Sequence, residues 1–162
     1  MPTVREPHFN SQDFRNTLGR FATGVTVVTA LENGNTHGMT ANAFISVSLD
    51  PPLVLVSLDN RCHMHRILPT AGRFGVSVLG EDQKTLSDHF AGVKAADVEI
   101  QFITQAGAAL LDGAIAHFSV KVVDIHPAGD HTLYVGLVEY SKYRDEKPLL
   151  FYAGRYQQLL AP

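Results

Sequence analysis

The sequence has little cysteine, no tryptophan and no excess of basic charge. Its single cysteine, Cys62, excludes a disulfide framework and any zinc site built from several cysteines. Lysine and arginine number 13 against 16 acidic residues, for a net charge of -3, so no basic surface is expected to bind nucleic acid. The apolar run at residues 53–56 is too short to cross a bilayer. We therefore expect neither a nucleic-acid nor a membrane partner.

The N-terminal residues also lack the apolar stretch of a secretory signal, which favours a cytoplasmic location. With 162 residues, of which 45% are apolar and 18% charged, the chain is long and apolar enough to bury a core of its own. The same composition excludes intrinsic disorder. We predict one domain over residues 1–162, with residues 1–10 as an N-terminal arm because of Pro2 and Pro7.

Short segments with alternating or β-branched apolar residues dominate the chain and predict strands. They lie at residues 25–31, 39–49, 53–58, 74–78, 116–122, 133–140 and 149–152. Helices are predicted at 12–21 after an N-cap at Ser11, at 82–91 before a cap at Gly92, and from Asp59 or Asn60 to Leu68. Residues 93–113 are expected to form a loop with a short helical piece. Because helices and strands do not alternate strictly, we predict an antiparallel barrel with peripheral helices.

The segment 39–49 alternates most clearly and is predicted to be one half-buried strand. The apolar positions expected to share its inner face are Met39, Ala41, Ala43, Ile45, Val47 and Leu49. Hydroxyl and amide side chains occupy the other face. A solvent-facing strand of this composition is ordinary, but its small residues would also let a flat ligand approach the strand amides.

Two further patterns bear on the strands. Residues 53–58 form a near-continuous apolar run, which predicts a strand buried on both faces. Asn33-Gly34 follows the first predicted strand and is a strong signal for a hairpin turn.

Common phosphate-binding and hydrolytic motifs are missing. The sequence contains no G-x-G-x-x-G, no G-x-x-x-x-G-K-[ST], no G-x-S-x-G and no H-E-x-x-H. The run Cys62-His63-Met64-His65 invites a metal site, but neighbouring side chains on a helix diverge, so a solvated turn is the better interpretation. We predict no metal site.

Seven segments in a fixed order carry a resemblance to a known family. They are residues 21–29 (FATGVTVVT), 38–44 (GMTANAF), 56–59 (VSLD), 73–79 (RFGVSVL), 90–92 (FAG), 129–136 (GDHTLYVG) and 148–156 (PLLFYAGRY). Together they resemble the short-chain flavin reductases, which are the reductase components of two-component flavin-dependent monooxygenases. The resemblance implies a mainly β, six-stranded antiparallel split barrel of Greek-key type that binds flavin as a homodimer.

The resemblance also implies a set of site residues. Those expected to bind the flavin are Thr40, Ala41, Asn42, Ala43, Ser57, Leu58, Asp59, Cys62, His63, Phe90, Ala91, Gly92, Tyr152 and Tyr156. His131 is expected on the nicotinamide side. The structural alternatives are that Phe90 packs in the core, Gly92 only ends a helix and Tyr152 only fills the barrel. The sequence departs from the family where relatives often carry Ser or Thr, since Cys62-His63 stands at the start of the helix that would hold the flavin phosphate.

The implied reaction is hydride transfer from NADH or NADPH to FMN or FAD, after which reduced flavin passes to a partner monooxygenase. The cofactors carry this chemistry, which agrees with the lack of a catalytic triad or carboxylate pair. Three alternatives remain open: a flavin-binding electron carrier without reductase activity, an FMN-dependent reductase of a cobalt corrinoid or Fe(III) chelate, and an enzyme similar to pyridoxamine-phosphate oxidase.

Overall fold

The computed structural model describes residues 9–93 and 97–160. The helices there are α1 (Ser11–Leu18), α2 (His63–Ala71) and α3 (Lys84–Phe90). The strands are β1 (Thr23–Gly24), β2 (Thr26–Glu32), β3 (Asn35–Ala41), β4 (Phe44–Leu49), β5 (Pro52–Asp59), β6 (Arg73–Val78), β7 (Phe102–Gln105), β8 (Ala108–Leu111), β9 (Ala116–Ala128), β10 (His131–Tyr143), β11 (Leu150–Tyr152) and β12 (Arg155–Gln157). None of the helices in these residues is long and apolar enough to cross a membrane.

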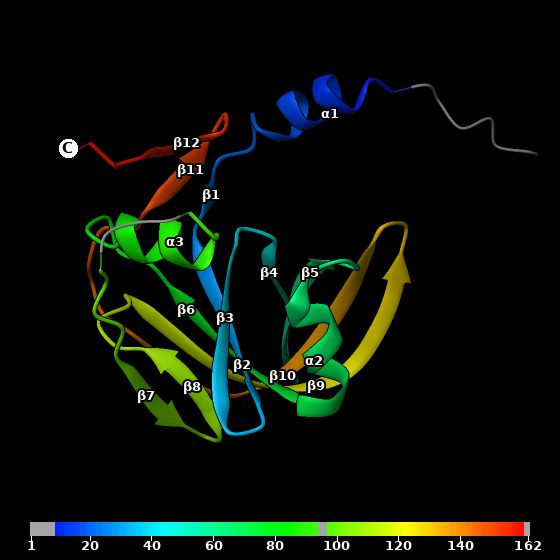
Figure 1. Cartoon of the computed structure of the whole chain (residues 1–162), viewed down its shortest axis with the longest axis vertical. Coiled ribbons are helices and arrows are strands. Elements are labelled where there is room, and N and C mark those ends of the chain that lie inside the picture. Colours follow the sequence, from blue (N-terminus) through cyan, green and yellow to red (C-terminus); the bar gives the residue numbers. More distant parts are fainter. Residues whose placement is uncertain (1–8, 94–96, 161–162) are drawn as a thin grey trace, which may run out of the picture.

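The main sheet has seven antiparallel strands in the order β3-β2-β6-β9-β10-β5-β4. Its two edge strands, β3 and β4, are joined by Asn42 and Ala43 alone. So short a link forces the sheet to curve round until its edges come close, which makes a barrel that is split between β3 and β4 (Figure 1). The predicted mainly β, antiparallel architecture is confirmed, although the main sheet has seven strands and not six.

The interior of the curved sheet is closed by α2. Met64, Ile67 and Leu68 of this helix pack with Phe74 of β6 and Tyr134 of β10. A second apolar cluster lies on the opposite face of β2, where α3 and β12 cover it with Phe90 and Tyr156. Figure 1 shows α2 beside β5, with α3 and the β7–β8 hairpin on the other side of the molecule. The strand β2 is therefore buried on both faces from Thr26 to Ala30.

The prediction of one strand over residues 39–49 is wrong, because the chain leaves one edge of the sheet at Ala41 and enters the other edge at Phe44. The predicted inner face holds for Met39 and Ala41, which pack against the core, but it is wrong for β4. Ile45, Val47 and Leu49 are exposed by 55%, 48% and 94% of their surface. Phe44 packs against the core instead, and an irregularity in the β4–β5 ladder between Ser46 and Ser48 interrupts the alternation.

Other predicted elements need smaller corrections. The short helical piece predicted within residues 93–113 is not found in the described part of this segment, where β7 and β8 form a hairpin instead. Only one face of β5 is buried in the single chain, because Val54, Val56 and Leu58 point into the core and the alternate residues stay partly exposed. The helix α2 begins after an N-cap at Cys62, not at Asp59 or Asn60.

The turns were predicted more accurately than the helix ends. Asn33 and Gly34 form the β2–β3 turn with φ values of 51° and 79°, which confirms the hairpin. Gly92 follows α3 with φ of 80° and lets the chain leave the helix, whose C-cap is Ala91. The N-cap of α1 is Asn10 and not Ser11. Of the predicted arm at 1–10, residues 1–8 lie outside the described residues.

Candidate active site

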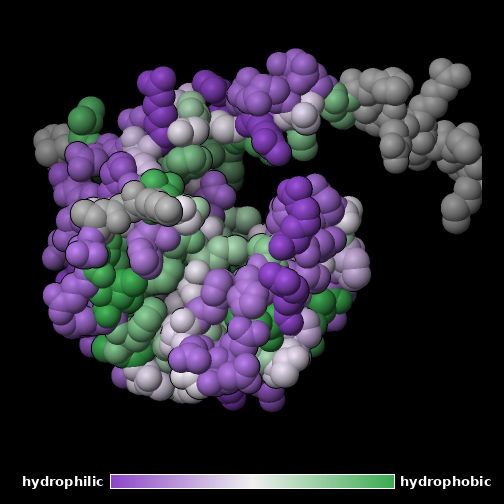
Figure 2. Space-filling model, in the orientation of Figure 1, coloured by the Kyte–Doolittle hydropathy of each residue, from purple (hydrophilic) through white to green (hydrophobic). Residues whose placement is uncertain are grey.

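A wide groove of about 920 Å³ lies where the sheet is split. One wall is the link between β3 and β4, with Asn42 and Ala43, and the opposite wall is α1 and the segment after it, with Arg15, Arg20 and Phe21. Figure 2 shows a hollow in the surface below α1. The volume is in the range of cofactor-binding clefts.

A smaller pocket of about 210 Å³ adjoins the same link. Its lining residues are Val25, Thr40, Ala41, Asn42, Ser87, Ala91, Phe151 and Tyr156. Five of these belong to the residues expected to bind flavin. Asn42 lines both cavities, because it stands in the short link between the sheet's edges. The structure therefore brings the predicted group at 40–43 together with Ala91 and Tyr156.

A chain of hydrogen bonds ties β3 to α3 and β12. The Thr40 hydroxyl donates to the Ser87 carbonyl at 2.6 Å, and the Ser87 hydroxyl lies 2.7 Å from the Tyr156 hydroxyl. Phe90 rests on Gly38, where an added Cβ would come within 2.5 Å of the ring. The hydroxyl proton of Thr40 is thus engaged in holding α3, and Phe90 covers β3 from the helix.

The link also contacts β5. The amide of Ser57 donates to the Ala43 carbonyl at 3.1 Å. Ser57 and Asp59 lie on one face of β5, and Asp59 is opposite His131 in the β5–β10 ladder. A continuous path therefore runs from Asn42 and Ala43, through Ser57 and Asp59, to His131.

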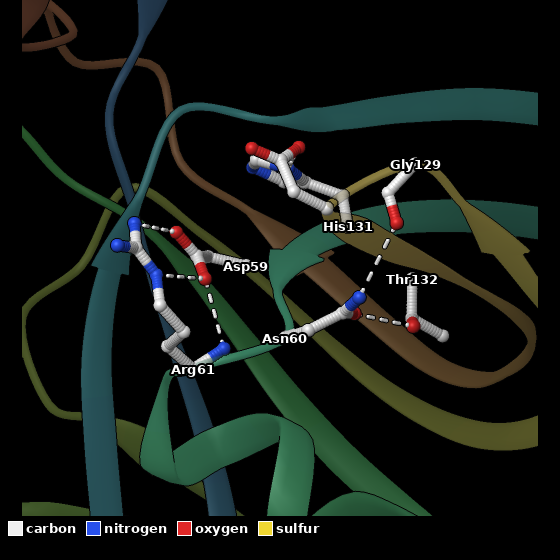
Figure 3. Close-up of polar contacts among 7 residues, drawn as sticks. Asp59, Asn60, Arg61, Gly129, His131 and Thr132 are labelled. Carbon is white, nitrogen blue, oxygen red and sulfur yellow. Dashed lines mark hydrogen bonds and ion pairs between the residues drawn. The ribbon is translucent and has the colours of Figure 1, made fainter.

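The far end of this path is a compact polar cluster (Figure 3). Asp59 accepts hydrogen bonds from the Arg61 backbone amide at 2.8 Å and from its guanidinium at 3.1 and 2.7 Å. These bonds hold the pKa of the Asp59 carboxyl well below its usual range, and the carboxylate in turn raises the pKa of Arg61. Asp130 has a lowered pKa because it is hydrogen-bonded to His131. Both carboxylates are charged at neutral pH.

The start of α2 is held by side chains that the sequence had marked as cofactor ligands. The Cys62 sulfur accepts a hydrogen bond from the His65 amide at 3.4 Å and so caps the helix. His63 Nε2 lies 2.8 Å from a Glu32 carboxylate oxygen, and the ring of His63 stands edge-on to His37 at 4.6 Å. Among the described residues, no group of three or more His, Cys, Asp or Glu side chains is placed to hold a metal ion.

Eight of the fourteen residues expected to bind flavin line neither cavity; they are Ser57, Leu58, Asp59, Cys62, His63, Phe90, Gly92 and Tyr152. The Leu58 side chain is fully buried in the core and cannot reach a ligand in either cavity. Tyr152 lies on β11, where the Arg20 guanidinium sits 5.4 Å from its ring centre. Conversely, Ser87 and Phe151 line the small pocket although sequence reasoning missed them. Ser87 lies three residues before Phe90, and Phe151 lies in the 148–156 segment, but neither position carries a distinctive signal of its own.

Comparison with known proteins gives this site its context. Residues 18–160 match the family model described as the flavin reductase like domain. The chain belongs to the flavin reductase family. The resemblance found in the sequence is thus confirmed, over nearly the whole chain.

Curated relatives in the family are reductases by name. The chain is 48% identical over 157 residues to an NADH-dependent flavin reductase of Rhodococcus, covering 95% of this chain and 89% of that protein. It is 43% identical over 148 residues to an NADH-dependent FMN reductase of Agrobacterium fabrum, covering 91% and 85% of the two chains.

Solved structures of flavin reductases share the fold. The flavin reductase PheA2 superposes with a TM-score of 0.92 at 45% identity, covering 94% of this chain and 100% of that one. The styrene monooxygenase flavin reductase of Pseudomonas putida has a TM-score of 0.86 at 42% identity, covering 93% and 99%. The NADH:FAD oxidoreductase of Streptomyces globisporus, solved with NAD and FAD fragments, has a TM-score of 0.86 at 35% identity, covering 98% and 97%. These neighbours confirm the split-barrel prediction.

Proposed function

We propose that this protein transfers a hydride from NADH to FMN or FAD and releases reduced flavin to a partner flavin-dependent monooxygenase. The observation that carries the proposal is the continuous path from the β3–β4 link to His131 in a chain of the flavin reductase family. The relatives are named as NADH-dependent reductases of flavin, FMN and FAD, and one neighbour serves a styrene monooxygenase. NADH is therefore favoured over NADPH as the donor.

The residues present fit a flavin. The groove is large enough for the ring and its chain. The carbonyls of Asn42 and Ala43 already accept the Phe44 and Ser57 amides, so the link offers its backbone amides and the Asn42 side chain to a ligand. The Thr23 hydroxyl in the groove wall has no hydrogen-bond partner within the described residues. FMN or FAD, when bound, supplies the hydride acceptor.

The role of the protein is to hold and orient the flavin and the dinucleotide and to exclude water. Backbone amides at 41–43 and the Asn42 amide would bond the polar edge of the ring, where negative charge grows on reduction. Ser57 and the backbone of Leu58 and Asp59 would border the ring from β5. Phe90, Ala91 and Gly92 would close over it from the end of α3, with Tyr156 beside them and Tyr152 at the mouth. His131 would bind the nicotinamide carboxamide, so that donor and acceptor atoms meet in the right geometry.

The flavin phosphate needs donors that this sequence supplies in an unusual way. Because the Cys62 sulfur caps α2 through the His65 amide, the first free amides of the helix remain available. The positive end of the helix dipole favours an anion there. The Cys62 amide already donates to the Asp59 carbonyl at 3.0 Å, so we assign the phosphate to the backbone amide of His63, at the first turn of α2.

Homodimer formation is part of the proposal. Apolar side chains of β4, β5 and β10 lie on one face of the sheet by register and stay partly or fully exposed in the single chain; they are Ile45, Leu53, Leu55, Leu133, Val135 and Leu137. Ser57 and Asp59 continue this face along β5, so a second copy packed on it would border the flavin site. An apolar sheet face of this kind is typical of a subunit interface. The cytoplasmic location stays a prediction.

The direct test is consumption of NADH by the purified protein in air, with and without FMN, FAD and riboflavin. We expect oxidation of NADH only when a flavin is present, and weaker activity with NADPH. An electron carrier would show no such activity. A reductase of a cobalt corrinoid or Fe(III) chelate would need only bound flavin and would respond to the metal acceptor in place of free flavin. Lack of stimulation by every flavin contradicts the proposal.

A further inference from the structure

The imidazole of His131 has one hydrogen-bond partner within the described residues, the side chain that precedes it. His131 Nδ1 lies 2.7 Å from Asp130 Oδ1, at the start of β10. Asp130 is ionised at neutral pH, as its lowered pKa indicates, and an ionised carboxylate can only accept a hydrogen bond. The hydrogen atom between the two groups therefore belongs to His131 Nδ1.

This bond fixes what the opposite edge of the ring can do. A neutral imidazole carries one N–H, and the bond made by one nitrogen determines the role of the other. With Nδ1–H given to Asp130, Nε2 has a free lone pair and acts as an acceptor. An approaching ligand must then offer a donor to His131.

The turn that carries this pair is held from the β5–α2 connection. The Asn60 backbone amide donates to the Asp130 carbonyl at 3.0 Å, and the Asn60 side chain accepts from the Thr132 hydroxyl at 2.7 Å. The same side chain donates to the Gly129 carbonyl at 3.5 Å, as Figure 3 shows. Asp130 and His131 are thus presented by a turn that Asn60 fastens on both sides.

The other nearby carboxylate does not compete for His131. Asp59 lies opposite His131 across the β5–β10 ladder, but both of its oxygens are bonded to Arg61. Arg61 is therefore neutralised by Asp59, and Asp130 is left as the acceptor for the imidazole. Asp59 thus pairs with Arg61, and Asp130 pairs with His131.

We propose that Asp130 is a positioning residue that holds His131 in its Nδ1–H form, so that Nε2 accepts a hydrogen bond from the N–H of the nicotinamide carboxamide. The inference rests on the proposed function. It deepens that function by predicting which part of the donor is recognised: the amide N–H, and not its carbonyl. A dinucleotide whose carboxamide is replaced by a group without N–H should then bind more weakly and be a poorer substrate.

The tautomer can be measured on the protein alone. Long-range proton–nitrogen spectra of protein labelled with ¹⁵N-histidine distinguish Nδ1–H from Nε2–H, and loss of one signal in His131→Gln assigns the ring. We expect Nδ1–H in the native protein and loss of this single form in Asp130→Ala. The matched control is Asp124→Ala, since Asp124 pairs with His126 on the same hairpin at 3.0 Å. An Nε2–H signal for His131 in the native protein overturns the proposal, as does an unchanged tautomer in Asp130→Ala.

Kinetics provide the second arm. Asp130→Ala should raise the KM for NADH by about threefold to tenfold, the equivalent of one hydrogen bond, with a smaller change in flavin affinity. Native protein should prefer NADH over the reduced 3-acetylpyridine analogue, which has no amide N–H, and Asp130→Ala should narrow this preference. Asp124→Ala should leave both the KM for NADH and the preference for NADH over the analogue unchanged. An equal preference in native and Asp130→Ala protein contradicts the inference, whereas failure of the proposed function would appear as no flavin-dependent NADH oxidation in native protein.

Discussion

Asn42 stands at the one place where both edges of the sheet meet. Its side chain borders the wide groove and the small pocket, and its carbonyl accepts the Phe44 amide at 3.0 Å. Asn42→Leu keeps the size of the side chain but removes the amide, so a polar atom of the bound flavin would be left unpaired. We expect flavin binding to weaken by about 1–3 kcal/mol, with the fold intact.

Flavin titration of the variant, followed by fluorescence, measures this loss. Asn35→Leu is the control, because Asn35 is an exposed residue at the opposite end of the same strand. Equal flavin affinity in Asn42→Leu and native protein would remove Asn42 from the site.

His37 makes the stability of the fold depend on pH. Burial lowers its pKa from 6.5, the nearby His63 lowers it further, and Glu32 partly opposes the shift. Because the unfolded chain takes up a proton at a higher pH than the folded chain, the free energy of unfolding falls as pH drops below about 6.5. His37→Gln should flatten this decline. Denaturant unfolding of both proteins at several pH values measures it, and parallel pH curves would refute the assignment.

Among the elements, α3 depends on its close approach to β3. An added Cβ at Gly38 would meet the Phe90 ring at 2.5 Å, so Gly38→Ala must push this ring and the end of α3 away. We expect a loss of about 1–3 kcal/mol in the free energy of unfolding. The same substitution in a Phe90→Leu background should cost clearly less, because the smaller side chain relieves the clash. Equal costs in the two backgrounds would mean that the strain lies elsewhere.

The element boundaries show where sequence patterns reach their limit. The alternation at 39–49 indicates extended chain correctly, but it cannot show that Asn42 and Ala43 carry the chain between opposite edges of a sheet. That break depends on barrel closure, which is set by strands far away in sequence. Similarly, β7 and β8 were missed because all four residues of β8 are buried by contacts with the distant strands β2 and β6, which leaves no local periodic pattern.

In the site, too, some features could be predicted from the sequence and others could not. Residues 40–43 border the two cavities, as the family resemblance led us to expect, whereas the binding roles of these residues and of 129–131 stay predictions. The engagement of Thr40 by Ser87 and of Asp59 by Arg61 could not be predicted, since each depends on how the side chains are oriented in the fold. The role of Cys62 as a helix cap likewise needed the backbone geometry of the α2 start.

At the scale of the whole molecule, the partly exposed apolar face of β4, β5 and β10 predicts a dimer. Leu55 lies between Ile45 and Val135 in the two ladders, at the middle of this face. Leu55→Glu would place a charge in the proposed interface at a large desolvation cost. We expect the native protein to sediment as a dimer and this variant as a folded monomer with weakened flavin binding.

The control for this experiment is Leu31→Glu, because Leu31 is an exposed leucine on β2, away from the proposed interface. It should remain dimeric. A native protein that sediments as a monomer, or a Leu55→Glu variant that stays dimeric, would show that the apolar face has another role.

The proposed function rests on one step, in which NADH and flavin meet on this protein and a hydride passes directly between them. Anaerobic stopped-flow mixing of the protein and flavin with NADH tests it, with NADH deuterated at the transferred position as the comparison. We expect the flavin absorbance to bleach rapidly only when the protein is present, and more slowly with the deuterated donor. Bleaching at the same rate with and without the protein would mean that the protein does not carry out this hydride transfer.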